Sequence, residues 1–103
     1  MGKKNRKGEH RRAARFELHA PAASRAFVAG SFNDWRPDAT PMRRQTDGRW
    51  VADIDVPPGR HEYKFVVDGS WCCAVGPDGP TEQFEGGVPN AMGTTNRVIE
   101  VPR

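Results

Sequence analysis

The chain has 103 residues, of which 36% are hydrophobic, and it carries a formal net charge of +3. A chain of this length is typical of a single domain. It contains no apolar run long enough to span a membrane or to form the core of a signal peptide. We therefore expect a cytoplasmic protein with no membrane partner.

The positive charge is concentrated at the start of the chain. Residues 1–15 hold seven Lys or Arg and a single Glu, whereas the remainder holds nine basic and twelve acidic residues. Residues 1–14, MGKKNRKGEHRRAA, lack apolar periodicity and are predicted to form a basic disordered arm before one domain over residues 15–103. The mildly acidic domain argues against a nucleic-acid-binding surface. Only the arm is a candidate for contacts with RNA, lipid or an acidic protein, and a solvated tail is the simpler interpretation.

Short strand-like runs separated by turn signals follow the arm. The runs are RFELHA (15–20), RAFVAG (25–30), RWVADIDV (49–56), HEYKFVVD (61–68) and RVIEV (97–101), and the turn signals are TDG (46–48), PPG (57–59) and DG (68–69). No window of helical length shows a period of 3.6 residues. A period of two with closely spaced turns predicts an all-β fold, an antiparallel β-sandwich. Residues 74–96, which are rich in Gly and Pro, are expected to form a long ordered loop.

Two of these runs assign residues to faces. Trp50 is in phase with the apolar residues of its run and is predicted to lie in the core. In the run 61–68, the odd-numbered residues from His61 to Val67 share one face, and Lys64 lies on the opposite face with its polar and apolar neighbours. The alternation therefore predicts that Lys64 points away from the core.

The sequence offers no metal, cofactor or catalytic pattern. Cys72 and Cys73 are adjacent, which rarely fits disulfide geometry, so we expect two reduced thiols. The three histidines lack the spacing of a metal site. Asp53 and Asp55 alternate outward on one strand and do not form the pair of acid and base that glycoside hydrolysis requires. We therefore expect a protein that is not an enzyme and needs no cofactor.

Trp35 and Trp71 do not fit the core pattern. Each follows a turn and is flanked by small or polar residues, in GSFNDW and VVDGSW. One interpretation is that the two rings fold back and cap the ends of the sandwich. The other is that they form an exposed platform, because an indole ring suits the apolar C–H face of a sugar while nearby polar groups bind its hydroxyls. Lys64 is a candidate for such a polar group, and an ordinary exposed lysine is the alternative.

Four segments carry a resemblance to a known family. FVAGSFNDW (27–35), PM (41–42), GRWVADIDVPPGRHEYKFVVDGSW (48–71) and MGTTNRVIEV (92–101) together resemble carbohydrate-binding module family 48. That family includes the glycogen-binding domain of the AMP-activated protein kinase β subunit and the N-terminal domains of glycogen-branching and debranching enzymes. The resemblance covers residues 15–102 and implies an immunoglobulin-like β-sandwich that binds α-1,4-linked glucans.

The resemblance also implies roles for individual residues. Trp35 and Trp71 match the tryptophans that stack on glucose units, and Lys64 matches the lysine that bonds to sugar hydroxyls. A late loop is implied to add an apolar contact and two polar ones, and here those positions are Met92, Thr94 and Asn96. The chain departs from the family at CCAVGP, where the family often has Asp-Pro, and in a longer loop over residues 78–91.

The most direct functional hypothesis is non-catalytic binding of a glycogen-like or starch-like polysaccharide, or of a maltooligosaccharide. A glycogen-metabolising enzyme or a kinase is the candidate protein partner. The alternative is a protein-interaction adaptor domain that docks on its partner through the same exposed aromatic residues.

Overall fold

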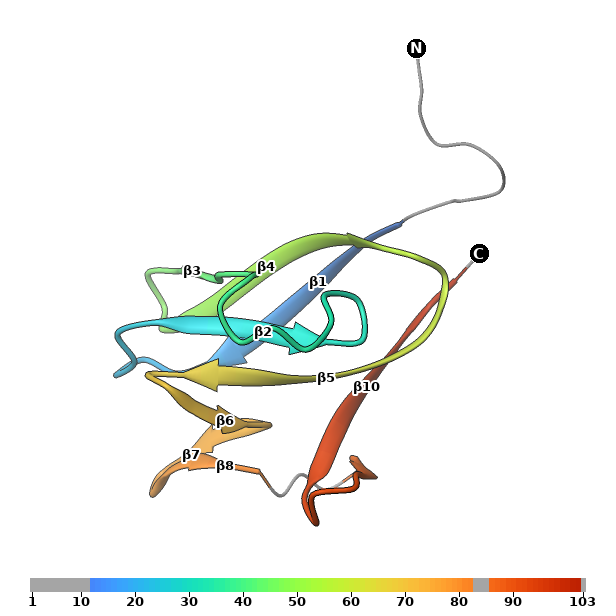
Figure 1. The fold of residues 1–103 in the computed structure, drawn as a ribbon. Coiled ribbons are helices and arrows are strands. Elements are labelled where there is room, and N and C mark those ends of the chain that lie inside the picture. Colours follow the sequence, from blue (N-terminus) through green and yellow to red (C-terminus); the bar gives the residue numbers. More distant parts are fainter. Residues whose placement is uncertain (1–11, 83–85, 103) are drawn as a thin grey trace.

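The computed structural model describes residues 12–82 and 86–102, so most of the expected arm lies outside the described residues. The described residues form ten strands and no helix (Figure 1). The strands are β1 (Arg12–His19), β2 (Ala26–Gly30), β3 (Arg43–Arg44), β4 (Arg49–Val56), β5 (Gly59–Val67), β6 (Ser70–Cys72), β7 (Ala74–Gly76), β8 (Gly79–Thr81), β9 (Val88–Pro89) and β10 (Thr95–Val101). Across the described part of the chain, no helix has the length and apolarity that a membrane crossing needs.

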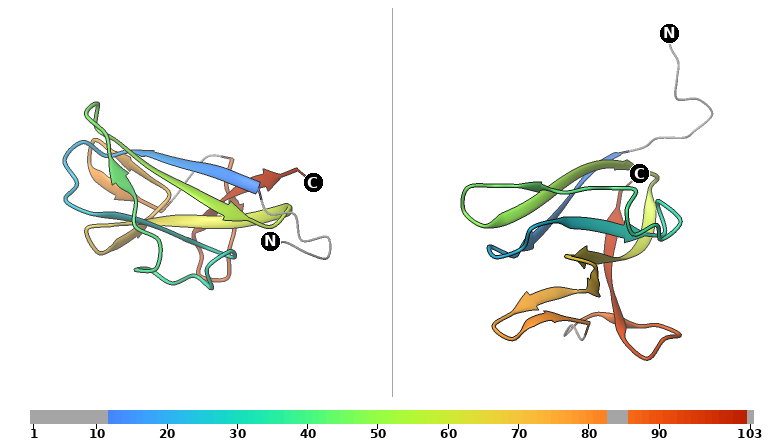
Figure 2. Two further views of the ribbon diagram at one scale, coloured as in Figure 1. Left: turned by 90° about the horizontal axis from the view of Figure 1, so that it is seen from above. Right: turned by 60° about the vertical axis from the view of Figure 1, so that its left-hand side comes forward.

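Two sheets form the layers of the sandwich (Figure 2). One sheet has the order β1-β4-β3, and the other has the order β2-β5-β10-β9 with β6 paired to β5. Every strand pairing in both sheets is antiparallel. The predicted antiparallel β-sandwich is therefore confirmed.

The core lies between the inner faces of these sheets. Phe16 and Leu18 from β1 pack with Val28 from β2, and with Trp50 and Phe65 from β4 and β5. Trp50 is buried and its indole Nε1 donates a hydrogen bond of 2.9 Å to the carbonyl of Ala20, which satisfies the polar atom of this core residue. The prediction for Trp50 is confirmed.

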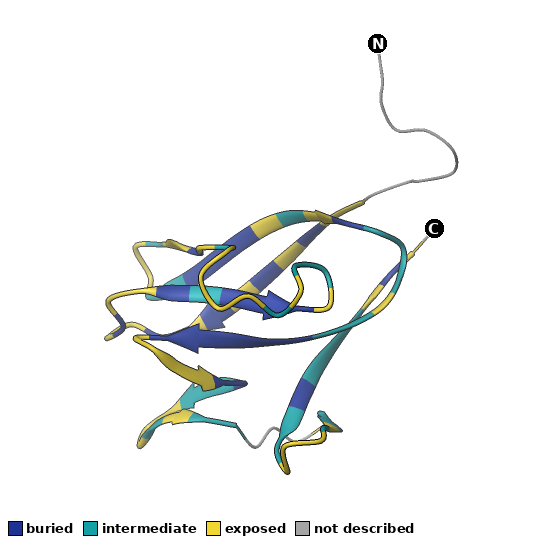
Figure 3. Ribbon diagram, in the orientation of Figure 1, coloured by how far each residue is buried: buried dark blue, intermediate teal, exposed yellow. Residues whose placement is uncertain are grey.

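The strand β5 is buried on both of its faces at its C-terminal end. Residues 63–67 are all buried, whereas the start of the strand is half-buried or exposed (Figure 3). Tyr63, Phe65 and Val67 belong to the core cluster, and Lys64 and Val66 face the other way. A strand with one face in the core becomes buried on its second face only when another part of the chain covers it.

Two boundaries differ from the expectations. The strand β1 begins at Arg12, so residues 12–14 pair with β4 instead of belonging to the arm. Ala14 is buried and continues the alternation of Phe16 and Leu18. Because alanine is small, its place in this alternation did not mark residues 12–14 as part of the strand. The expected loop over residues 74–96 contains the hairpin β7–β8, the strand β9 and the first residues of β10.

The two cysteines are free and buried, as expected for reduced thiols. Cys72 belongs to the core, and Cys73 donates a hydrogen bond of 3.1 Å from Sγ to the carbonyl of Thr95. Burial raises the pKa of the Cys72 thiol to about 11, and the neighbouring Cys73 adds to this shift. The Cys72 thiol therefore stays protonated at neutral pH.

Candidate functional site

The GSFNDW segment forms a tight loop at the end of β2. A Cβ atom on Gly30 would lie 2.5 Å from the carbonyl oxygen of Glu62, so only glycine fits here. The Asn33 side chain closes the loop, because its Oδ1 accepts a hydrogen bond of 3.0 Å from the Gly30 amide and its Nδ2 donates bonds of 3.1 Å and 2.9 Å to the Val28 carbonyl and Thr40 Oγ1. Gly and Asn thus fix the shape of this loop.

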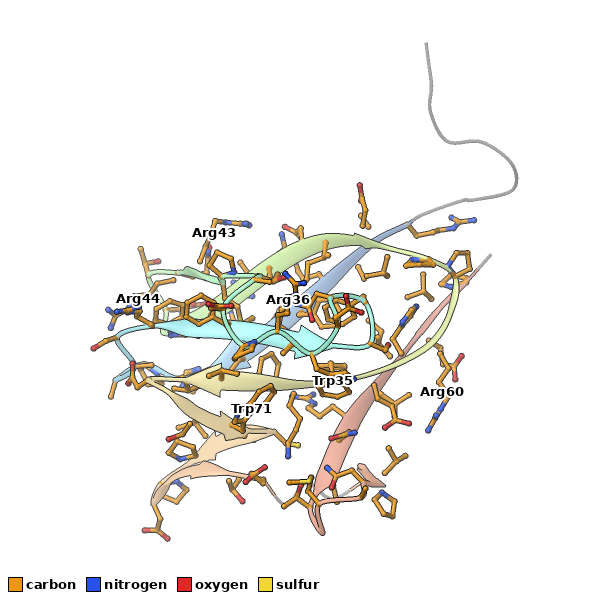
Figure 4. All side chains as sticks on the ribbon, in the orientation of Figure 1. Trp35, Arg36, Arg43, Arg44, Arg60 and Trp71 are labelled. Carbon is orange, nitrogen blue, oxygen red and sulfur yellow. The ribbon has the colours of Figure 1, made fainter. Side chains whose placement is uncertain are left out.

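The same loop sets the direction of Trp35. Asp34 and Trp35 both have positive φ angles, of 59° and 57°, and the Trp35 amide donates a hydrogen bond of 3.0 Å to the Gly30 carbonyl. A bulky residue in this left-handed region is a genuine outlier, and such conformations concentrate at functional sites. The loop places Trp35 on the same side of the five-stranded sheet as Trp71 (Figure 4).

Trp71 follows the hairpin turn between β5 and β6. Asp68 and Gly69 have φ angles of 48° and 87°, as a two-residue hairpin turn of this kind requires. The turn pairs Trp71 directly with Val66, which is on the outer face of β5 together with Lys64. The Trp71 ring is therefore presented outside the core, and the residue is 36% exposed.

Lys64 points away from the core as predicted, but it is not an exposed lysine. The residue is only 5% exposed, and its Nζ donates hydrogen bonds to the carboxylate of Glu82 and, at 3.0 Å, to Thr94 Oγ1. The interpretation of Lys64 as an ordinary exposed lysine is wrong because the segment before β10 covers this face of β5. A buried ammonium group needs such partners, and here Glu82 is its counterion.

The turn before β10 is held by the side chain of Asn90. Its Oδ1 accepts hydrogen bonds of 2.9 Å from the Met92 amide and 3.1 Å from the Thr94 amide. Its Nδ2 donates a hydrogen bond of 2.8 Å to Asn96 Oδ1. Asn96 in turn donates a hydrogen bond of 2.9 Å to Glu62 Oε1 on β5. This network orders the polar side of the site and leaves Met92 85% exposed at the tip of the turn.

All six residues singled out in the sequence line one open pocket of 480 Å³ on the outer face of the five-stranded sheet. They are Trp35, Lys64, Trp71, Met92, Thr94 and Asn96. Glu82 and Asn90 also line the pocket and were missed by the sequence analysis. Both residues lie in the segment 74–96 that was expected to be a loop. The Asn90 and Gly93 pair is a weak sequence signal for a turn, whereas no sequence pattern marks Glu82 as part of a site.

The pocket combines two indole rings and a thioether with a set of mixed hydrogen-bonding groups. Lys64 supplies N–H donors, Glu82 supplies a carboxylate acceptor, and the amide of Asn96 supplies both. Such a surface suits a ligand with apolar faces and polar edges.

The acidic pair of β4 lies on the other sheet. The carboxylate of Asp53 accepts hydrogen bonds of 2.9 Å and 3.0 Å from Arg15 and one of 3.3 Å from Arg43. Arg15 holds the pKa of Asp53 below its ordinary value, so this carboxylate stays ionised and paired. Asp53 and Asp55 are both exposed, as predicted for this face.

Known proteins provide an independent comparison. The family described as the glycogen recognition site of AMP-activated protein kinase matches residues 14–103. The 5'-AMP-activated protein kinase subunit beta-1 of Sus scrofa is 36% identical over 77 residues, which are 75% of this chain and 54% of that protein. Subunit beta-1 of Homo sapiens and subunit beta-2 of Mus musculus are also 36% identical over 75% of this chain, and the match covers 24% and 25% of their lengths. The chain thus spans about half of the first relative and about a quarter of the other two.

Proposed function

The chain belongs to the family of the glycogen recognition site of AMP-activated protein kinase, and on this premise we propose that it binds α-1,4-linked glucans without acting on them chemically. The observation that carries the proposal is the pocket that unites Trp35, Trp71 and Lys64 on one face of the sheet. These residues come from three separate segments of the chain. The packing of the core does not explain why the indole rings of Trp35 and Trp71 lie outside it.

The two tryptophans would supply the apolar part of the binding surface. The C–H face of a glucosyl ring is apolar and carries slight positive charge, whereas an indole face carries negative charge, so the two surfaces attract each other. Trp71 lies on a strand and Trp35 on a loop fixed by Asn33, so the rings need little ordering when a ligand binds. Met92 would add an apolar contact at the open edge of the pocket.

The polar groups would orient the sugar. The ammonium group of Lys64 has three protons, and its partners among the described residues, Glu82 and Thr94, engage two of them, so the third would serve a sugar hydroxyl. Thr94 and Asn96 would bond to further hydroxyls. Because each contact is modest, we expect a dissociation constant on the order of 10–1000 μM for a short glucan and stronger attachment to a polymer that offers many sites.

A protein partner is a second proposal. The printed names of the relatives describe kinase subunits, and the chain matches only part of each. We propose a kinase or a glycogen-metabolising enzyme as the partner. Docking of such a partner directly on Trp71 and Met92, the exposed large hydrophobic residues among those described, is the alternative use of the pocket.

A titration with maltoheptaose or β-cyclodextrin, followed by tryptophan fluorescence, tests the glucan proposal. The wild type should show quenching and should sediment with glycogen, whereas Trp35→Ala and Trp71→Ala should each weaken binding about tenfold or more. Arg43→Ala on the opposite sheet is the control and should bind like the wild type. If the wild type and both tryptophan variants elute from glycogen alike, the glucan proposal fails and the adaptor function becomes the better explanation.

A further inference from the structure

Glu82 is held at the pocket by its own backbone. Its carbonyl oxygen accepts hydrogen bonds from the Thr95 amide at 3.3 Å and from Thr95 Oγ1 at 2.9 Å, which attach the residue to the start of β10. Its carboxylate forms the ion pair with Lys64. The Glu82 side chain is 42% exposed, whereas that of Lys64 is 7% exposed. A ligand that enters the pocket therefore meets the carboxylate more readily than the ammonium group.

This ion pair changes the charge that the pocket presents. A lysine ammonium beside two indole rings would by itself attract a phosphate group, because lysine is a common phosphate-binding residue. Glu82 cancels that charge, and its carboxylate is the more exposed member of the neutral pair. Glu82 is also the acidic side chain among the described residues that line the pocket, since Glu62, which bonds to Asn96, lies outside the lining and is paired with Arg60. No basic side chain other than Lys64 lines the pocket among the residues that the structure describes.

We infer that Glu82 makes the pocket selective for uncharged glucans and excludes glucosyl units that carry a phosphate monoester. The carboxylate accepts hydrogen bonds from neutral sugar hydroxyls, whereas it repels a phosphate placed at the same hydroxyl. The ion pair with Lys64 leaves no net positive charge to offset that repulsion. This inference depends on the proposed glucan function and names the ligand class of the same site.

The test compares maltoheptaose with maltoheptaose that carries one phosphate monoester, using calorimetric titration of the full chain. We expect the wild type to bind the neutral ligand about tenfold more tightly at about 0.01 M salt. Glu82→Gln keeps an acceptor for Lys64 but removes the negative charge, so the ammonium group is no longer neutralised and the preference for the neutral ligand should disappear or reverse in favour of the phosphorylated one. Asp78→Asn in the exposed β7–β8 turn removes the same charge away from the pocket and should keep the wild-type ratio.

Two further measurements separate charge from a loss of structure. Glu82→Asp keeps the charge and should keep most of the selectivity. In the wild type, the selectivity should shrink at about 1 M salt, where charges are screened within about 3 Å. A wild-type ratio near one, or an unchanged ratio in a folded Glu82→Gln variant, would overturn this inference alone. Failure of the wild type to bind either ligand would overturn the glucan function and this inference with it.

Discussion

Nδ2 of Asn33 lies 2.9 Å from Oγ1 of Thr40, and this hydrogen bond ties the loop that carries Trp35 to the segment that runs back along β2. Thr40 also accepts a hydrogen bond of 3.1 Å from the Val28 amide through its carbonyl oxygen. The position of Trp35 is therefore set by side chains that do not touch the pocket.

Asn33→Ala should weaken both stability and glucan binding. The substitution removes the bonds to the Gly30 amide, the Val28 carbonyl and Thr40, which together should cost about 1–3 kcal/mol of unfolding free energy. The Trp35 ring should lose its fixed direction, so affinity for maltoheptaose should fall several-fold. Urea unfolding and fluorescence titration measure the two effects. Thr40→Val removes one of the bonds and should have a smaller effect on both, and equal effects would contradict this account.

Gly30→Ala should destabilise the fold because no space exists for the added methyl group. The new Cβ would lie within 2.5–2.8 Å of the Glu62 carbonyl oxygen, the Phe32 ring and Tyr63 Cβ. We expect a loss of about 1–3 kcal/mol in thermal or urea unfolding. Gly76→Ala is the matched control, because its nearest neighbour beyond the adjacent residues lies 4.0 Å away. A Gly30→Ala variant as stable as the Gly76→Ala variant would show that the close approach is absent.

Asn90→Ala should affect binding more than stability. The turn before β10 would lose the acceptor for the Met92 and Thr94 amides and the donor for Asn96. We expect several-fold weaker binding of maltoheptaose and a loss of about 1 kcal/mol in unfolding free energy. Asn90→Asp keeps the acceptor but not the donor and should give an intermediate affinity. Wild-type affinity in Asn90→Ala would show that the turn does not need this side chain.

The stability of the fold should decrease at alkaline pH. Burial raises the pKa of Cys72 from 9.0 to about 11, so the unfolded thiol ionises first while the folded thiol keeps its proton. This contribution is fully present below about pH 9 and is lost as the pH rises to about 11. Burial also raises the pKa of Tyr63, which adds to the slope. Urea unfolding between about pH 9 and 11 should show that the free energy of unfolding falls less steeply with pH in Cys72→Ala than in the wild type. An identical pH dependence in the two proteins would exclude Cys72 as its cause.

Much of the fold followed from local patterns. The alternation in residues 49–56 predicted the burial of Trp50, and the Asp-Gly pair predicted the turn before Trp71, although the pairing of β6 with β5 after that turn was not predicted. Period-two patterns say which face a residue occupies, but they do not say what covers that face. The burial of Lys64 was therefore unpredictable, because its cover comes from Glu82 and Thr94, far along the chain.

The missed elements share a physical cause. In VGPDGPT, Gly76 and Gly79 close the β7–β8 hairpin, yet four Gly or Pro residues within a short segment are also typical of a loop. Glu82 acts through bonds to Lys64 and Thr95, far from it in the sequence, and Asn90 acts through bonds within its own turn, and neither kind of contact leaves a periodic signal. Trp35 and Trp71, by contrast, could be identified as candidate site residues from the sequence because each large aromatic residue follows a turn.

The strand β5 contributes to the interior and to the pocket at the same time. It pairs with β2, β6 and β10, the strands that adjoin the three segments forming the pocket. A deletion of one residue near the middle of β5 would exchange its faces, so that Lys64 would point into the sandwich and Phe65 outward. A change of register in β5 would therefore disturb the pocket and the core together. A single substitution on the outer face of β5 can change the pocket and leave the core intact.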